Sequence, residues 1–293
     1  MIQYFLYKIG MWIAFILPVK LSYPLASFVA VLQYRFSRKD RKSVINNLKV
    51  ILASEDDKAM EPMAKEVFIN FSKYLVDFFR FSLVDKNNIE KFVKIEGREN
   101  IEEAFKNGKG IIAVTAHIGN WELAGIVTAI IGYPVTAVAL SHKHKHVNEL
   151  FVRQRESKGV NVVPLGVALR KCYAALKKNE VIGLVGDRDF TQGGISMEFL
   201  GKTVKIPKGP AMFSVKTGAP IVMTFAIRQP DDSYKLIYKK PIYYKDTGNP
   251  EEDVKTITKK FITEIEAQIR LYPQQWFMFR EFWADDANKV DIL

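Results

Sequence analysis

Cysteine and histidine are scarce in this chain of 293 residues. The single cysteine, Cys172, excludes an intramolecular disulfide and favours a reducing, cytosol-facing compartment. Its position in an amphipathic stretch predicts a small buried filler. The four histidines are not spaced with cysteines as zinc ligands are. We therefore expect no metal ion.

Long uninterrupted hydrophobic runs are also missing. The N-terminus has two shorter runs, residues 2–17 and 21–34, and Gln3 and Lys8 interrupt the first. Neither reaches the roughly 18 to 20 apolar residues that cross a bilayer, although the first would span if Lys8 snorkels. The basic cluster follows these runs, which disfavours a secretory signal peptide. The pattern predicts two helices at a membrane interface, with a buried helix pair as the alternative.

Acidic residues are rare near the N-terminus. Residues 1–50 contain eight Lys or Arg and one Asp, so they carry +7 of the net charge of +11. A localised basic excess predicts contact with an anionic surface. The neighbouring apolar runs favour an anionic membrane over nucleic acid, for which no reader motif is present.

Linkers rich in Gly, Pro or Ser and internal repeats are absent as well. Residues 1–92 show helical spacing of apolar residues, whereas strand-like runs alternate with helical ones from residue 93 onward. This order predicts an α/β fold with a mostly parallel central sheet flanked by helices. We expect a helical membrane-associating region over residues 1–92 and a catalytic α/β domain over 93–293. The predicted strands are 92–97, 111–116, 135–140, 160–164, 181–186, 195–201, 220–228 and 234–240.

The stretch AHIGNWELAG, residues 116–125, holds the most informative polar residues. His117 follows a buried strand, while Gly119 and Asn120 form a turn that caps the next helix. We expect Glu122, in that helix's first turn, to accept a hydrogen bond from His117 Nδ1 and leave Nε2 free as a general base. The alternative is a histidine that satisfies a strand end beside a glutamate that favours the helix N-terminus.

A nucleophile is not apparent beside His117, because the Gly-x-Ser-x-Gly motif is absent. The histidine would then activate the hydroxyl of a substrate directly. We expect the donors for an oxyanion among the backbone N–H groups near Gly119.

Two further polar clusters leave alternatives open. Asp187 and Asp189 flank Arg188 at a predicted strand end, where they form an ion pair, bind substrate hydroxyls or hold a metal; the ligand spacing disfavours metal. The stretch SHKHKH, residues 141–146, alternates histidine with lysine. The lysines would repel a cation, so this stretch predicts an anion-contacting rim or plain solvent exposure.

The His-x4-Glu spacing after a buried strand resembles the His-x4-Asp/Glu motif of glycerolipid acyltransferases. The longer AHIGNWELAG block is similar to one branch, the lauroyl/myristoyl acyltransferases of lipid A biosynthesis and the related phosphatidylinositol mannoside acyltransferases. Four more blocks follow in the family's order: RESKG (155–159), VGDRDF (185–190), EFLGKTVKIPKGPAMFSVKTGAPIV (198–222) and YPQQWFMFREFW (272–283). Leu200, Gln274 and Phe282 depart from the family's pattern and put the acceptor in question.

The resemblance implies an acyltransferase that moves a fatty acyl chain from acyl carrier protein or coenzyme A to a hydroxyl of a membrane glycolipid. The acceptor would be a lipid A precursor, or alternatively a mannoside-type glycolipid or a lysophospholipid. His117 would be the general base with Glu122 as its orienter, and Arg155 would bind phosphate or stabilise charge; Arg153 is an equally good local candidate. Further substrate contacts are implied at Asp187, Arg188, Asp189, Phe199, Gly201 and Asn120.

The resemblance also implies that no cofactor is needed beyond the acyl thioester, and that the enzyme works at the cytoplasmic face of the inner membrane. Two rival functions use the same features. One is a peripheral membrane protein that binds anionic lipid without chemistry. The other is a thioesterase, in which water replaces the acceptor.

Overall fold

A seven-stranded β-sheet forms the centre of the computed structural model, which describes residues 2–142, 144–191 and 193–283. Its strands run in the order β1-β9-β8-β2-β5-β3-β4. Their bounds are β1 (Val93–Glu96), β2 (Ile111–Thr115), β3 (Val135–Ala139), β4 (Val160–Pro164), β5 (Val181–Val185), β8 (Ile221–Arg228) and β9 (Tyr234–Tyr238). Every neighbouring pair is parallel except β8 and β9. The predicted α/β fold with a mostly parallel sheet is confirmed.

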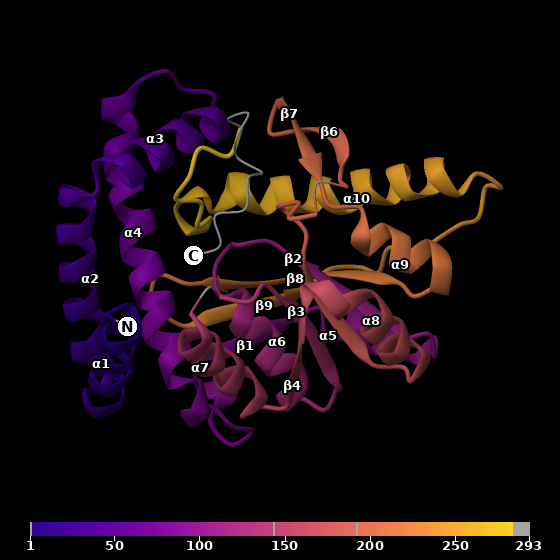
Figure 1. Ribbon diagram of the computed structural model, residues 1–293, viewed down its shortest axis with the longest axis horizontal. Helices are drawn as coiled ribbons and strands as arrows, with labels where there is room; N and C mark the ends of the chain where they lie inside the picture. Colours follow the sequence, from indigo (N-terminus) through magenta and orange to yellow (C-terminus); the bar gives the residue numbers. More distant parts are fainter. Residues whose placement is uncertain (1, 143, 192, 284–293) are drawn as a thin grey trace.

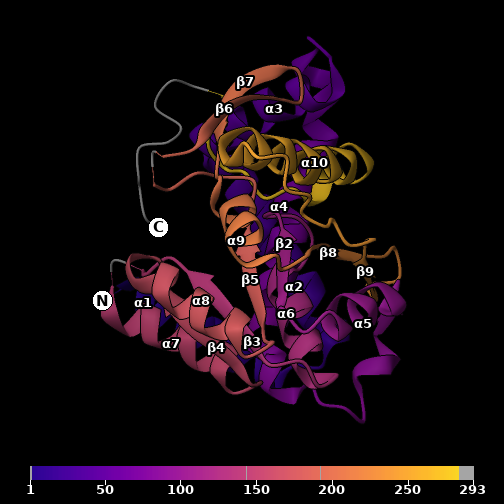
Figure 2. The same cartoon turned by 90° about the vertical axis from the view of Figure 1, so that its right-hand side faces the viewer.

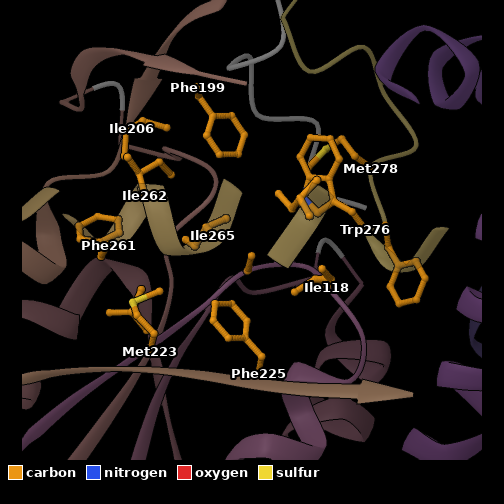
Figure 3. Packing of buried hydrophobic residues seen from close by; sticks show 14 of the residues in the cluster. Ile118, Phe199, Ile206, Met223, Phe225, Phe261, Ile262, Ile265, Trp276 and Met278 are labelled. Atoms are coloured by element: carbon orange, nitrogen blue, oxygen red, sulfur yellow. The ribbon is translucent and has the colours of Figure 1, made fainter. Parts of the chain in front are cut away.

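Helices cover both faces of this sheet, because side chains of successive strand residues point to opposite sides. Ile111 packs in the cluster of α5 (Arg98–Lys106), α6 (Trp121–Ile130) and α7 (Lys145–Glu156). Its neighbour Ile112 packs in the cluster of α8 (Ala168–Lys177), α9 (Gly209–Thr217) and α10 (Pro250–Leu271). Figure 1 shows α10 and α6 on opposite sides of the sheet. Figure 3 shows Phe225 of β8 facing Phe261 and Ile265 of α10.

Four helices precede the sheet and stack beside it at the left of Figure 1. They are α1 (Ile2–Ile16), α2 (Val19–Phe36), α3 (Arg38–Leu52) and α4 (Asp57–Arg80). Short 3-10 turns η1 (Phe81–Leu83) and η2 (Ile89–Lys91) lead from α4 to β1, while η3 (Leu165–Val167) precedes α8 and η4 (Pro273–Gln275) follows α10. Leu48 and Phe68 lie in one hydrophobic cluster with Trp276, so these helices share the core of the sheet. The division of the chain between residues 92 and 93 stays a prediction.

The outer face of α1 and α2 is apolar and exposed. Trp12, Phe28 and Phe36 have 66%, 61% and 76% of their surface accessible. Other exposed apolar residues on the two helices are Phe5, Leu6, Ile9, Phe15, Ile16, Val19, Leu21, Leu25, Val29 and Leu32. In the described part of the chain, no helix combines the length and the apolar character needed to cross a bilayer.

A β-hairpin outside the main sheet is the element that the sequence did not reveal. The predicted strand at 195–201 is β6 (Ile195–Phe199), and it pairs with β7 (Lys202–Ile206) beside α10 (Figure 2). Leu200 and Gly201 join the two strands with φ of 54° and 86°. Positive φ at both central residues is the pattern of a type I′ turn, which Gly201 adopts without strain.

The lone cysteine behaves as expected. Cys172 is fully buried in α8, and burial raises the pKa of its thiol to about 11. The thiol is therefore not activated by the basic residues that lie near it in the sequence. Its role is to fill space in the core.

A buried polar network joins the N-terminal helices to the sheet. Arg228, the last residue of β8, forms an ion pair with Asp77 of α4 and donates hydrogen bonds to Tyr23 of α2 and Tyr234 of β9. Both tyrosine hydroxyls donate to the Asp77 carboxylate at 2.5 Å. The Arg228 side chain is only 5% exposed, so this network holds α2, α4 and the sheet in one arrangement.

Replacing Arg228 should therefore destabilise the whole fold. Arg228→Ala leaves the Asp77 carboxylate in the interior without its cation, and we expect a loss of about 3 to 5 kcal/mol in the free energy of unfolding. Lys235→Ala, which breaks an exposed pair with Glu96 at 3.3 Å, should cost less than about 1 kcal/mol. Urea denaturation of both variants measures the difference, and similar losses would contradict the role of the network.

Candidate active site

A cavity of about 630 Å³ includes the carboxyl ends of β2, β3 and β5 in its wall. This edge of an open α/β sheet is where binding sites gather. His117, Glu122, Arg155, Arg188 and Asp189 line it together with many apolar side chains. The apolar part of the wall includes Leu75, Ala137, Val138, Leu165, Leu184, Met212 and Phe277. The structure thus gathers five of the nine predicted site residues around one largely apolar space.

His117 is held by Asp187, at the end of the adjacent strand. Thr115 of β2 is paired with Val185 of β5, so the residues two positions further along each strand meet. His117 Nδ1 lies 2.8 Å from Asp187 Oδ1, and the backbone N–H of His117 donates to Oδ2 at 3.0 Å. Trp276 Nε1–H donates to the same oxygen at 2.9 Å. The imidazole keeps 22% of its side-chain surface exposed, whereas the carboxylate is completely buried.

These contacts keep Asp187 ionised. Burial alone would raise the pKa of the Asp187 carboxyl, but His117 and the hydrogen bonds from Trp276 and the backbone lower it below its ordinary value. The lowered pKa stabilises the fold above the pKa of the unfolded chain, about 3.9, and this contribution is lost as the pH falls through the folded value. An ionised carboxylate at Nδ1 fixes the proton on that nitrogen, so Nε2 is the acceptor.

The position of Glu122 corrects the expected pairing with His117. Arg155 of α7 donates from Nε to Glu122 Oε2 at 2.7 Å and from Nη2 to Oε1 at 2.5 Å. Successive helical residues turn by about 100°, and Trp121 faces the imidazole at 5.2 Å between ring centroids. Glu122 therefore points toward α7. The carboxylate that orients the imidazole follows β5, which is adjacent to β2 in the sheet but distant from it in the sequence.

The Glu122–Arg155 pair is bidentate and nearly buried. The Arg155 side chain is 12% exposed and that of Glu122 10%. Burial alone would lower the pKa of the Arg155 guanidinium, but the Glu122 carboxylate raises it above its ordinary value. Both hydrogen bonds from the Arg155 guanidinium go to Glu122. A phosphate group would therefore have to compete with this carboxylate for the contact that was expected of Arg155.

The turn before α6 is fixed by backbone contacts. Gly119 has φ of +59°, and its N–H donates to the carbonyl of Gln275 at 2.9 Å. The N–H of Asn120 donates to the carbonyl of Ala226 at 2.8 Å, and its side-chain oxygen accepts from the N–H of Leu123 at 2.9 Å. The N–H groups of Gly119 and Asn120 are thus engaged within the fold, and the expectation of oxyanion donors near Gly119 stays a prediction. Asn120 caps the helix as predicted.

The triplet 187–189 separates its three side chains. The Asp189 carboxylate shapes its own loop by accepting from the N–H groups of Thr191 and Gly194 at 2.9 and 2.7 Å. The Arg188 guanidinium faces the cavity, 4.6 Å from the ring centroid of Phe190. Among the described residues, no group of His, Cys, Asp and Glu side chains is arranged to hold a metal ion.

Three expected substrate contacts lie away from the cavity that the described residues form. Phe199 is completely buried and packs with Trp276, as Figure 3 shows. Gly201 forms the exposed hairpin turn, and Asn120 is buried under the helix that it caps. In the structure these residues contribute to packing, turn geometry and capping, and the substrate contacts that the resemblance implied for them stay a prediction.

The histidine-rich stretch divides between the cavity and the surface. His142 lines the cavity, and its ring lies 4.5 Å from that of Phe151. His144 precedes α7, and His146 packs against Tyr4 with ring centroids 5.4 Å apart. Lys143 lies outside the described residues. His144 and His146 are exposed, as the alternative of plain solvent exposure expected, and the anion-contacting rim stays a prediction.

Trp276 and Tyr74 are the site residues that local sequence reasoning missed. Trp276 holds Asp187, and the Tyr74 ring stacks on Trp121 at 4.5 Å. The closing block PQQW was noticed in the sequence, but its contact with a strand 89 positions earlier has no local signal.

Comparison with known proteins agrees with this geometry. Residues 1–285 match the family described as "Bacterial lipid A biosynthesis acyltransferase". The phosphatidylinositol mannoside acyltransferase of Mycolicibacterium smegmatis is 26% identical over 83% of this chain and 79% of its own length. The enzyme of the same name from Mycobacterium tuberculosis is 25% identical over 83% and 77%. The lipid A biosynthesis palmitoleoyltransferase of Escherichia coli is 26% identical over 74% and 73%.

Gly119 offers a test of how tightly the turn beside His117 is clamped. A Cβ at Gly119 would lie 2.1 Å from the carbonyl oxygen of Ala226, whereas one at Gly108, also at positive φ, would meet nothing within 4 Å. We expect Gly108→Ala to cost about 1 to 2 kcal/mol of folding free energy from backbone strain alone. Gly119→Ala should lower the folding free energy clearly more, since β8, which carries Ala226, must also move. Equal losses in chemical denaturation would show that the turn is not clamped.

Proposed function

Because this chain belongs to the bacterial lipid A biosynthesis acyltransferase family, we propose that it transfers a fatty acyl chain from a thioester to a hydroxyl of a membrane glycolipid. The membership predicted from the sequence blocks is confirmed, and the relatives named above are all acyltransferases. The observation that carries the proposed chemistry is the His117–Asp187 pair, which faces an apolar cavity.

In the proposed reaction, His117 Nε2 takes the proton of the acceptor hydroxyl as its oxygen attacks the thioester carbonyl carbon. The new C–O bond forms, and collapse of the tetrahedral intermediate breaks the C–S bond. The thiolate leaves with the proton from the imidazolium, so an ester and a thiol are produced. Asp187 stabilises the imidazolium through Nδ1–H, which is the arrangement of a base and its orienter.

The apolar wall of the cavity suits the acyl chain. Each methylene group removed from water contributes about 0.8 kcal/mol, so a long chain supplies much of the binding free energy. Tyr74 and Trp121 stack beside the imidazole and limit the access of water to it. A drier site strengthens the electrostatic contacts of the reaction and favours transfer over hydrolysis.

The substrates follow from the same proposal. The donor is a thioester of acyl carrier protein or coenzyme A, and the acceptor is a glycolipid of the lipid A precursor or phosphatidylinositol mannoside type. Relatives with both kinds of name match this chain at similar identity. The Glu122–Arg155 pair has a positioning role here: it braces α6, which carries Trp121, against α7.

Variants of the two candidate orienting carboxylates test this chemistry. His117→Ala should lower kcat by about 10² to 10⁴. Asp187→Asn should lower kcat by a similar factor, because an amide does not fix the productive tautomer of the His117 imidazole. Glu122→Gln should mainly lower stability, by leaving the Arg155 cation buried without its counter-charge.

Mass spectrometry of the products, with and without acceptor lipid, is the measurement. Free fatty acid formed equally fast without acceptor would indicate a thioesterase. Unchanged transfer in His117→Ala would refute the proposed base. A wild-type protein that binds lipid but forms neither product from any thioester would be a non-catalytic binder.

We also propose that the apolar face of α1 and α2 rests on an anionic membrane, at the cytoplasmic side of the inner membrane. The exposed aromatic residues supply the apolar contact, and the basic residues of the RFSRKDRK stretch, 35–42, supply charge at the end of α2 and the start of α3. This placement keeps a lipid acceptor close to the enzyme.

Introducing charge into this face should weaken membrane binding. In the double variant Trp12→Glu and Phe28→Glu we expect affinity for vesicles of anionic phospholipid to fall at least about tenfold, since each side chain loses about 1.5 to 3 kcal/mol of apolar burial. Leu271→Glu is the matched control, because Leu271 is 65% exposed at the end of α10. Cosedimentation measures binding, and an equal effect of the control would contradict the proposed face.

A further inference from the structure

We propose that Arg188, Arg280 and Lys208, which line the same cavity as His117, form a binding site for a phosphate ester carried by one of the substrates. This inference rests on the proposed function for the identity of the substrate. The binding site itself rests on the charges and contacts of these three residues and on the helix that Lys208 precedes.

Arg188 is a cation whose neighbours in the sequence do not neutralise it. The Asp187 carboxylate is held by His117 and Trp276, and the Asp189 carboxylate accepts hydrogen bonds within its own loop. In the described part of the chain, Arg188 forms no salt bridge with an acidic side chain; its guanidinium lies over the Phe190 ring at 4.6 Å. Stacking on an aromatic ring fixes the guanidinium plane and leaves its N–H donors directed outward.

Arg280 brings a second guanidinium to the same place. Burial and then the nearby charge of Arg280 lower the pKa of Arg188 to about 10, so the Arg188 guanidinium remains charged at neutral pH. Two cations that repel each other inside a partly buried cavity are stabilised when an anion binds to both. Phosphate suits this arrangement, because its oxygens match the N–H groups of guanidinium forks.

The N-terminus of α9 adds a third positive element. Lys208 is the N-cap residue of this nine-residue helix, and its side chain is exposed. No side chain among the described residues caps the helix, and Gly209, its first residue, lines the cavity with Lys208. The helix dipole places partial positive charge at the part of the cavity wall that Lys208 and Gly209 form.

The two carboxylates that line the cavity are engaged by other groups. Glu122 accepts both hydrogen bonds from Arg155, and Asp189 is engaged by Thr191 and Gly194. The resemblance to the family implied that Arg155 would bind phosphate or stabilise charge. The structure favours Arg188 and Arg280, which lie on the side of the cavity formed by β5, α9 and the segment after α10.

Two sources of the phosphate fit this chemistry. One is the phosphopantetheine arm of an acyl donor, and the other is the headgroup of a phosphorylated glycolipid acceptor. Binding and kinetic measurements separate the existence of the site from its source.

Calorimetric titration with inorganic pyrophosphate tests the site without any catalytic turnover. We expect Arg188→Gln and Lys208→Gln to weaken pyrophosphate binding at least about tenfold, the usual weight of one charge-assisted contact. Arg170→Gln on α8 and Lys216→Gln at the opposite end of α9 are matched controls, because both residues are exposed and neither lines the cavity formed by the described residues. Undetectable pyrophosphate binding by the wild-type protein, or equal weakening in the controls, would overturn the inference.

Steady-state kinetics then identifies the source. If the donor carries the phosphate, Arg188→Gln raises KM for acyl-coenzyme A at least about tenfold but leaves KM for the matching acyl-pantetheine, which lacks phosphate, unchanged. If the acceptor carries it, KM rises for the phosphorylated acceptor only. A lower kcat with both KM values unchanged would overturn the inference by showing a structural role. Binding of pyrophosphate through Arg188 in a wild-type protein without transferase activity would leave the site intact and refute the proposed function.

Discussion

The Asp187 carboxylate is completely buried, and three hydrogen bonds from His117 and Trp276 hold it there. A buried charge is costly unless its partners are in place, so this contact requires β2, β5 and the segment after α10 to meet at one point. A backbone hydrogen bond also joins β2 to the segment after α10, since the N–H of Phe277 donates to the carbonyl of His117. The imidazole is thereby oriented before any substrate binds, which is the main requirement for a general base.

The charged groups of the cavity have separate tasks because they are partnered separately. Asp187 is hydrogen-bonded to the imidazole, Glu122 accepts from Arg155, and Asp189 accepts from the backbone of its own loop. Arg188 and Arg280 then face the cavity as a positive region. In the proposed reaction an anionic substrate would be attracted to this region without displacing Asp187 from the imidazole, because that carboxylate is held by hydrogen bonds from His117 and Trp276.

The N-terminal helices connect this site with the surface that we propose to face the membrane. Their inner residues belong to the same hydrophobic clusters as the sheet, and the Arg228–Asp77 pair ties α4 to β8. Their outer residues expose aromatic side chains. One set of helices therefore contributes Tyr74 and Leu75 to the wall of the cavity and also presents the proposed membrane-facing surface. In this arrangement a lipid acceptor would reach the base without leaving the interface.

Sequence patterns by themselves determined the α/β class, the strands from β1 to β9 apart from β7, their alternation with helices, and the place of His117 at a strand end, because these depend on local periodicity and turn residues. The spacing of His117 and Glu122 was equally visible, but it suggested the wrong contact. Only the tertiary structure decided that Asp187 orients the imidazole, because strand order brings β5 beside β2 and no local signal encodes that order. The same holds for Trp276 and for the meeting of Arg188 with Arg280, which depends on how the chain returns to the sheet after α10.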